Sequence, residues 1–129
     1  MEFHYTVESN LSVEEAIHAV EARLKEKKFG VLWQMSITET LNSKGFDQIT
    51  TPYHVLEVCS PQQAEKLLLQ NPMANYFLPC RITVYEADGK TKIGMARPTV
   101  LMKPLNDETL MDIVATIEEQ LIEAIEHAK

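Results

Sequence analysis

Hydrophobic and polar residues follow two different periods along the chain, and the switches between the two outline its secondary structure. Alternation with a period of two residues, which predicts a strand, runs over 2–8, 31–37 and 53–59. Within the second run, the alternation places Val31 and Trp33 on the same face of the expected sheet. These three runs supply the first part of that sheet.

Two further strands are expected on either side of a tight turn. The runs 81–86 and 92–97 are rich in residues that favour strands, and the pair Asp88-Gly89 lies between them. An Asp-Gly pair suits a hairpin turn because both central residues of the turn need positive φ angles. The sequence therefore predicts a β-hairpin at this point.

Apolar residues at helical spacing mark three helices. The first follows a capping box formed by Ser12 and Glu15, and we expect Gly30 to supply the left-handed residue after its end. The second begins at Pro61 with the Ser60 side chain as its cap. Its buried side is expected to consist of Ala64, Leu67 and Leu68. The third begins at about residue 107, and its wide apolar stripe consists of Leu110, Met111, Ile113, Val114, Ile117, Leu121, Ile122 and Ile125.

The order of these elements predicts a single α+β domain over residues 1–129. The chain contains no glycine-rich phosphate loop and no series of parallel crossovers, and it has only four glycines. We therefore expect a mainly antiparallel sheet with its two long helices packed on one face. Residues 38–45 are expected to form a short helix that ends at Gly45. The segment 72–79 is too apolar for a free loop, so we expect it to pack on the core, on a ligand or on a second copy of the chain.

The charge balance argues against two classes of partner. The chain has 12 basic and 19 acidic residues, a net charge of −7. Nucleic acids and anionic membrane surfaces attract clusters of lysine and arginine, so we expect binding to neither. The N-terminal residues show no secretion signal, and no apolar run is long enough to span a membrane. We expect a cytoplasmic protein whose thiols stay reduced.

Three stretches resemble the family called domain of unknown function 302. They are Lys-Phe-Gly-Val at 28–31, Val-Leu-Glu-Val-Cys-Ser-Pro at 55–61, and Leu-Pro-Cys-Arg-Ile-Thr-Val-Tyr-Glu at 78–86. The third is distinctive, and the resemblance covers nearly the whole chain, although the family usually has Asn at the position of Ser60. The resemblance implies a curved antiparallel sheet in the order strand-helix-four strands-helix, similar in shape to the TATA-binding-protein fold. It also implies a homodimer and establishes no reaction.

The two cysteines are candidate functional thiols, and the resemblance points to both. Cys59 precedes the start of a helix, whose partial positive charge lowers the pKa of a nearby thiol, so we expect it to be the more reactive. Cys80 enters a strand and is expected to be the more buried. Three interpretations stay open: small core hydrophobes, redox or ligand-contacting thiols, and metal ligands. The spacing matches no zinc or Cys-x-x-Cys motif, so no metal is expected.

Four other residues are candidates for lining a ligand pocket: Glu57, Tyr76, Arg81 and Arg97. Glu57 is interpreted either as a base beside a thiol or as a residue that faces solvent or pairs across the sheet with Arg81. Arg97 is interpreted either as a ligand for an anion or as the partner of a carboxylate. Tyr76, together with Phe77, Trp33 and Met35, lines a pocket in one interpretation and fills the core in the other.

These features favour a small dimeric module that binds a small ligand or a partner. The alternative is a thiol-dependent redox or sulfur-handling protein that uses Cys59 and Cys80. The residues identify no cofactor and no Ser-His-Asp or Cys-His arrangement, so whether the chain is an enzyme stays open.

Overall fold

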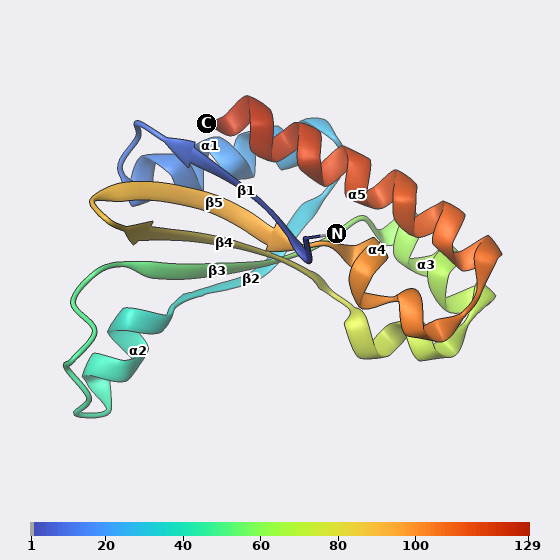
Figure 1. The fold of residues 1–129 in the computed structure, drawn as a ribbon, viewed down its shortest axis with the longest axis horizontal. Coiled ribbons are helices and arrows are strands. Elements are labelled where there is room, and N and C mark those ends of the chain that lie inside the picture. The colour runs from blue at the N-terminus through green and yellow to red at the C-terminus, as the bar shows by residue number, and fades with distance from the viewer. Residues whose placement is uncertain (1) are drawn as a thin grey trace.

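A five-stranded antiparallel sheet runs through the centre of the computed structural model, which describes residues 2–129 (Figure 1). The strands are β1 (His4–Ser9), β2 (Gly30–Ser36), β3 (Tyr53–Cys59), β4 (Cys80–Ala87) and β5 (Lys90–Ala96). Their order across the sheet is β1-β5-β4-β3-β2, so β1 and β2 are the edge strands. The first strand of the chain therefore pairs with the last.

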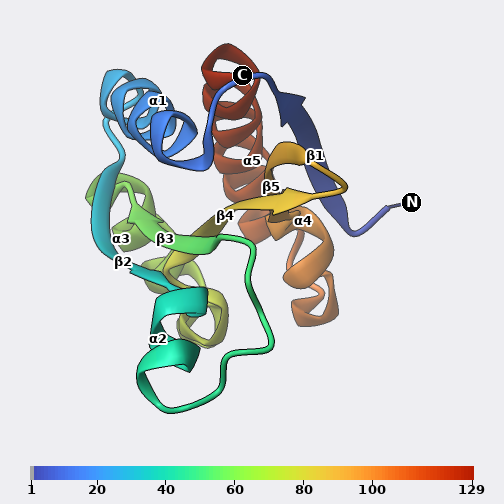
Figure 2. The same ribbon diagram turned by 90° about the vertical axis from the view of Figure 1, so that its left-hand side faces the viewer.

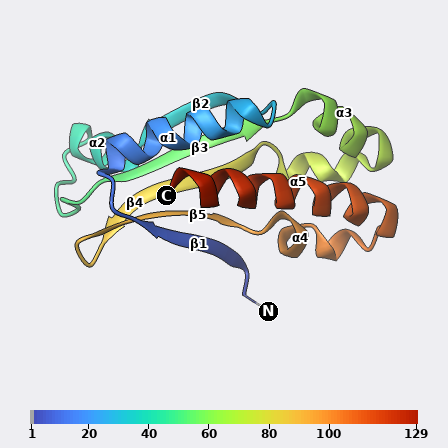
Figure 3. The ribbon, with the colours of Figure 1, turned by 90° about the horizontal axis from the view of Figure 1, so that it is seen from above.

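The two long helices, α1 (Val13–Glu26) and α5 (Glu108–Ala128), lie against the same face of the sheet (Figures 2 and 3). They also contact each other. This arrangement confirms the predicted fold class, an α+β protein with two long helices on one face of an antiparallel sheet. We call the sheet face that points away from α1 and α5 the open face.

Shorter helices lie beyond the two ends of the strands (Figures 1 and 3). One end carries α2 (Ile37–Ser43), which confirms the short helix expected there. The other end carries α3 (Pro61–Gln70), the 3-10 helix η1 (Pro72–Phe77) and α4 (Pro98–Leu101), with η2 (Lys103–Leu105) after it. Within the apolar segment 72–79, Ala74 is buried, while Phe77 and Leu78 pack against the core.

The core lies between the sheet and the long helices. Alternate strand residues such as Leu56, Ile82 and Ile93 are fully buried there. From α5, the stripe residues Leu110, Val114, Ile117, Leu121 and Ile125 are buried as predicted. The remaining stripe residues, Met111, Ile113 and Ile122, are half-buried and pack against the same core. The full width of the stripe is therefore in contact with the chain itself.

At the two ends of α1, one prediction from the sequence is confirmed and another is wrong. The predicted capping box is present, because the Glu15 N–H donates to the Ser12 hydroxyl and the Ser12 N–H donates to the Glu15 carboxylate. The left-handed residue, however, is Lys28 with φ 64°, and the expectation for Gly30 is wrong. The Phe29 N–H reaches back to the Leu24 carbonyl at 3.0 Å, so the turn is completed early and Gly30 already belongs to β2.

A β-bulge in β2 corrects a second expectation. Val31 lies opposite Val58 of β3, and Trp33 lies opposite Glu57, so Leu32 is an extra residue between the two pairs. The side chains of Val31 and Trp33 therefore point to opposite faces of the sheet, whereas strict alternation predicted one face. Val31 packs against the core, and Trp33 is 50% exposed.

The hairpin between β4 and β5 is confirmed, with Asp88 and Gly89 at φ angles of 55° and 74°. In α3 two expectations fail. The Ser60 side chain makes no capping hydrogen bond, and Leu68 is 41% exposed, because the helix contacts α5 through the side that carries Leu67. Among residues 2–129, no helix has both the length and the apolar character needed to cross a membrane.

Candidate functional site

The strands β4 and β5 pair along only part of their length. They pair from Ala87–Lys90 at the turn as far as Thr83–Gly94. Beyond this point β4 continues to pair with β3, as far as the pair Val58–Cys80. The strand β5 continues to pair with β1, as far as His4–Ala96. We call the space between residues 80–82 of β4 and 95–96 of β5 the strand fork.

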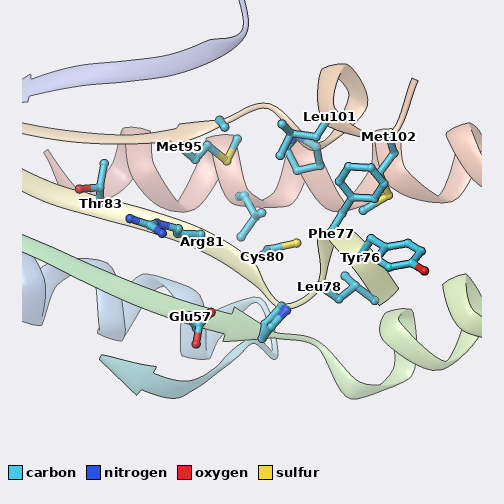
Figure 4. A pocket seen from close by; sticks show the side chains of 14 residues that line it. Glu57, Tyr76, Phe77, Leu78, Cys80, Arg81, Thr83, Met95, Leu101 and Met102 are labelled. Atoms are coloured by element: carbon cyan, nitrogen blue, oxygen red, sulfur yellow. The ribbon is translucent and has the colours of Figure 1, made fainter. Parts of the chain in front are cut away.

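A cavity of about 370 Å³ lies at the strand fork (Figure 4). On one side it is lined by Tyr76, Phe77 and Leu78, which follow one another through the end of η1. On another side it is lined by Leu101 and Met102 at the end of α4. The long helix α5 contributes Leu121. The cavity therefore draws its walls from segments that are far apart in the sequence.

The cavity has an apolar part and a polar part. Met102 and Leu121 are 1% and 0% exposed, so that side is closed by the protein core. Glu57, Arg81 and Thr83 lie on the other side, away from the aromatic residues of η1 (Figure 4). A ligand would thus meet aliphatic and aromatic side chains at one end and charged or hydroxyl groups at the other.

The structure brings three of the four predicted pocket residues to this cavity. Glu57, Tyr76 and Arg81 line it, and so does the candidate thiol Cys80. Tyr76 is 75% exposed and stands at the rim. Phe77 also lines the cavity, whereas Trp33 and Met35 belong to β2 and do not line it.

Arg97 does not line this cavity, and its side chain is directed to a carboxylate of the fold. Its Nε lies 3.3 Å from a carboxylate oxygen of Glu118, which is 7% exposed. The other Glu118 oxygen accepts from the Thr99 backbone N–H at 2.9 Å and from the Thr99 hydroxyl at 2.7 Å. Glu118 thus joins α5 to the start of α4, and the second interpretation of Arg97, a carboxylate partner, is confirmed.

Glu57 and Arg81 lie directly opposite each other on β3 and β4. They are therefore cross-strand neighbours, but within residues 2–129 no hydrogen bond or ion pair joins them. Glu57 is half-buried and Arg81 is exposed. Both charged groups remain available at the polar end of the cavity.

The two cysteines are free thiols that share a second, much smaller cavity of about 20 Å³. Its other walls include Phe29, Leu67 and Ile117. Cys80 lines both this space and the larger cavity, whereas Cys59 lines only the smaller one. The two strand ends therefore bring the sulfur atoms into one region.

The predicted lowering of the Cys59 pKa is wrong, because burial raises the pKa of this thiol. The apolar walls of the small cavity remove water that would solvate a thiolate, and this loss of solvation is the cause of the rise. Burial also raises the pKa of Cys80, to about 11, and negative charge on Cys59 adds to the rise. Cys80 is the more strongly shielded of the two, as the sequence indicated.

Several residues of the larger cavity were missed by the sequence analysis. Met95 and Ala96 look like ordinary strand positions, and they line the cavity only because β5 leaves β4 at Gly94. Leu101 and Met102 lie between Pro98 and Pro104, and this apolar run within an irregular connection was the signal available.

A shallow concavity of about 510 Å³ adjoins the cavity along the open face of the sheet. The two share Thr83, Met95 and Ala96. The polar residues that line the concavity include His4, Thr6, Glu8 and Lys92. Across residues 2–129, no group of three or more His, Cys, Asp or Glu side chains is placed to hold a metal ion.

The geometry can be set against known proteins. The family described as "Domain of unknown function DUF302" matches residues 5–128. Among solved structures, the crystal structure of an uncharacterized conserved protein DUF302 from Bacillus stearothermophilus is 45% identical in sequence. The match covers 100% of both chains with a TM-score of 0.97. A comparison with curated proteins found no match.

Proposed function

The chain belongs to the DUF302 family, a domain of unknown function, and we propose that it is a binding module for a small ligand. The observation that carries this proposal is the cavity at the strand fork. Its volume of about 370 Å³ falls within the roughly 300–1,000 Å³ of small-molecule sites. Its mainly apolar walls and few polar groups at one end are also typical of such sites.

The fold supports the cavity without help from a ligand. Glu118 fixes the start of α4 by three hydrogen bonds, and the cavity residues Pro98, Leu101 and Met102 lie in α4 or directly after it. The sheet register fixes the position at which β4 and β5 separate. A site that is formed before binding loses little conformational entropy when the ligand enters.

The state of the thiols favours binding over thiol chemistry. A thiol with a pKa of about 11, as for Cys80, is almost fully protonated at neutral pH and is then a weak nucleophile. Burial raises the Cys59 pKa as well. Cys80 thus acts as a small apolar part of the cavity wall, and the thiol-dependent redox alternative has no supporting observation.

The proposal is tested by filling the cavity. Ala96 is exposed and lines the cavity, so Ala96→Trp places an indole over the open space without displacing core residues. Ala22→Trp, at an exposed position of α1, is the matched control. We expect Nile red, a neutral apolar dye, to bind the parent protein and the control equally and to bind Ala96→Trp at least about tenfold more weakly. Equal binding by all three proteins would overturn the proposal.

A second candidate is self-association, which a patch of exposed apolar residues favours. Four of them follow one another through α3 and η1: Leu68, Leu69, Met73 and Tyr76, with exposures of 41%, 81%, 53% and 75%. Exposed apolar patches of this kind often mark protein interfaces. The proposed partner is a second copy of the chain, joined through this α3–η1 patch.

The proposed location is the cytoplasm, where two thiols without a disulfide stay reduced.

A further inference from the structure

The charged residues around the cavity and the adjoining open face differ in whether they already have a partner. Lys92 lies 3.1 Å from a carboxylate oxygen of Glu8. Arg97 is held by Glu118 at 3.3 Å. The His4 ring nitrogen Nδ1 is 2.8 Å from the Thr6 hydroxyl. Each of these groups is committed to a neighbour within the fold.

Arg81 is different. Within residues 2–129, its guanidinium takes part in no ion pair and no hydrogen bond, although it lines the cavity. The chain carries a net charge of −7, so carboxylates that could occupy an arginine are abundant. An unpaired arginine at the polar end of an apolar cavity is therefore the group with capacity for a ligand.

The shape of the cavity further restricts the ligand. Figure 4 shows the Arg81 side chain extending away from Tyr76 and Phe77, toward the side where Thr83 lies. The residues at the other end, including Leu101 and Met102, offer no charged group. A molecule that satisfies both ends must have an apolar body and one polar group, and that group must accept hydrogen bonds from a cation.

We propose that the cavity at the strand fork binds an amphipathic carboxylate, with its apolar body between β4 and β5 and its carboxylate on the Arg81 guanidinium. This inference rests on the proposed binding function and names the ligand class. The planar guanidinium presents two parallel N–H donors that match the two oxygens of a carboxylate.

Glu57 sets the charge that the ligand can carry. Its carboxylate lies on β3 directly opposite Arg81, without pairing to it. A dianion such as a phosphate monoester would meet repulsion from Glu57 that a single positive charge only partly offsets. A carboxylate with one charge meets less, so it fits better. Glu57 is thus a group that limits affinity for anions and helps to choose among them.

The test compares three probes of equal chain length: octanoate, 1-octanol and octylamine. Each is titrated against the parent protein, and the chemical shifts of its backbone amides are followed by NMR. We expect octanoate to bind at least about tenfold more tightly than octanol, because a charge-assisted bidentate contact is made by the acid alone. Octylamine should bind more weakly than octanol, because Arg81 repels it.

Two variants assign the effect to the proposed residues. In Arg81→Gln the preference for octanoate should disappear, while octanol binding should stay within about twofold. Arg81→Lys keeps the charge without the planar pair of donors, so it should retain only part of the preference. In Glu57→Gln octanoate should bind about two- to fivefold more tightly, because one repulsive charge is removed, and octanol should be unaffected.

The outcomes separate this inference from the function on which it rests. If octanol and octanoate bind equally and Arg81→Gln changes neither, the carboxylate inference is wrong and the binding module stands. Tighter binding of octylamine would make Glu57 the anchor and would also overturn the inference. If no probe binds and Ala96→Trp leaves dye binding unchanged, the binding function itself fails.

Discussion

Thr83 on β4 and Gly94 on β5 are the last two residues that these strands pair before they separate around the cavity. Gly94 also lies opposite Thr6 of β1, so three strands meet at this position. A Cβ atom on Gly94 would lie 2.5 Å from the Thr6 hydroxyl oxygen and 3.0 Å from the Tyr5 carbonyl oxygen. The absence of a side chain here allows β1 to approach β5 closely.

Substitution of Gly94 should therefore be costly. We expect Gly94→Ala to lower the free energy of unfolding by about 1–3 kcal/mol, the usual range for overpacking. The control is Gly30→Ala, whose Cβ would find its nearest neighbour at 4.0 Å and should cost little. Urea denaturation of both variants measures the difference. Adding Thr6→Ala should recover part of the loss, and equal stability of the two glycine variants would contradict the account.

Stability should fall in alkaline solution because of Cys80. The thiol pKa rises from 9.0 in the unfolded chain to about 11 in the fold, so between these values the unfolded chain binds fewer protons. The contribution of the Cys80 thiol to the free energy of unfolding is fully present below pH 9. It is lost as the pH rises toward 11 and amounts to at most about 3 kcal/mol. Cys80→Ala should remove this part of the decline in urea denaturation curves measured across pH. An unchanged pH profile would show that the thiol is not shielded.

Tyr5 should add a second alkaline component. Burial, together with a hydrogen bond to Glu126 at 2.6 Å, raises the pKa of the Tyr5 hydroxyl from 10.0 to about 12. Between these two values the unfolded chain again binds fewer protons than the folded chain, so Tyr5 contributes stability that is lost as the pH rises from 10 toward 12. Tyr5→Phe should flatten the profile in that window and leave the part near pH 9 in place. A spectrophotometric titration of the phenol in native protein gives the pKa directly.

The two thiols should resist alkylation of the native protein at neutral pH. Burial raises both pKa values, and the thiolate is the species that reacts with iodoacetamide. Labelling followed by peptide mass spectrometry should show Cys59 reacting first as the pH is raised, and Cys80 only near pH 11 or after unfolding. Rapid labelling of either cysteine at pH 7 would revive the redox interpretation.

Loss of the Glu118 carboxylate should loosen the cavity wall. Glu118→Gln keeps one acceptor oxygen but turns an NH₂ group toward either Arg97 or Thr99. We expect a loss of about 1–3 kcal/mol in stability and weaker Nile red binding, because α4 then loses its anchor. Glu119→Gln, at the exposed neighbouring position, is the control and should change neither property.

Self-association through the α3–η1 patch is tested at its most exposed residue. Leu69 is 81% exposed, and Leu69→Glu places a charge in the proposed interface. Sedimentation at micromolar concentration should report a dimer for the parent chain and a monomer for this variant. Leu32→Glu, on an exposed residue of β2, is the control and should remain dimeric. A monomeric parent chain at every concentration would end this proposal.

The parts of the fold that the sequence predicted well are those with local causes. The Asp88-Gly89 turn needs only two adjacent residues, and the capping box needs only Ser12 and Glu15. The α5 stripe is equally local, because its spacing alone decides which residues face the sheet. In each of these places the physical reason lies within a few residues of the element.

The errors arise where distant segments decide the outcome. Alternation along β2 could not reveal the extra residue at Leu32, since the bulge exists only in relation to β3. The role of Arg97 depended on Glu118, which comes from a different helix. The cavity itself depends on how far β4 pairs with β5, which no spacing in the sequence encodes. Glu57, Tyr76 and Arg81 were identified as candidates, but the reason they share a site is tertiary.

The bulge at Leu32 also affects whether the edge of the sheet can pair with a strand of another molecule. As an edge strand, β2 presents backbone donors and acceptors along one side that could pair with a strand from another molecule. Leu32 and Trp33 are 60% and 50% exposed, so an unbroken edge here would combine free backbone groups with apolar side chains. The extra residue breaks the regular spacing of these groups and bends the strand. The inserted residue therefore disfavours edge-to-edge pairing of β2 with another sheet.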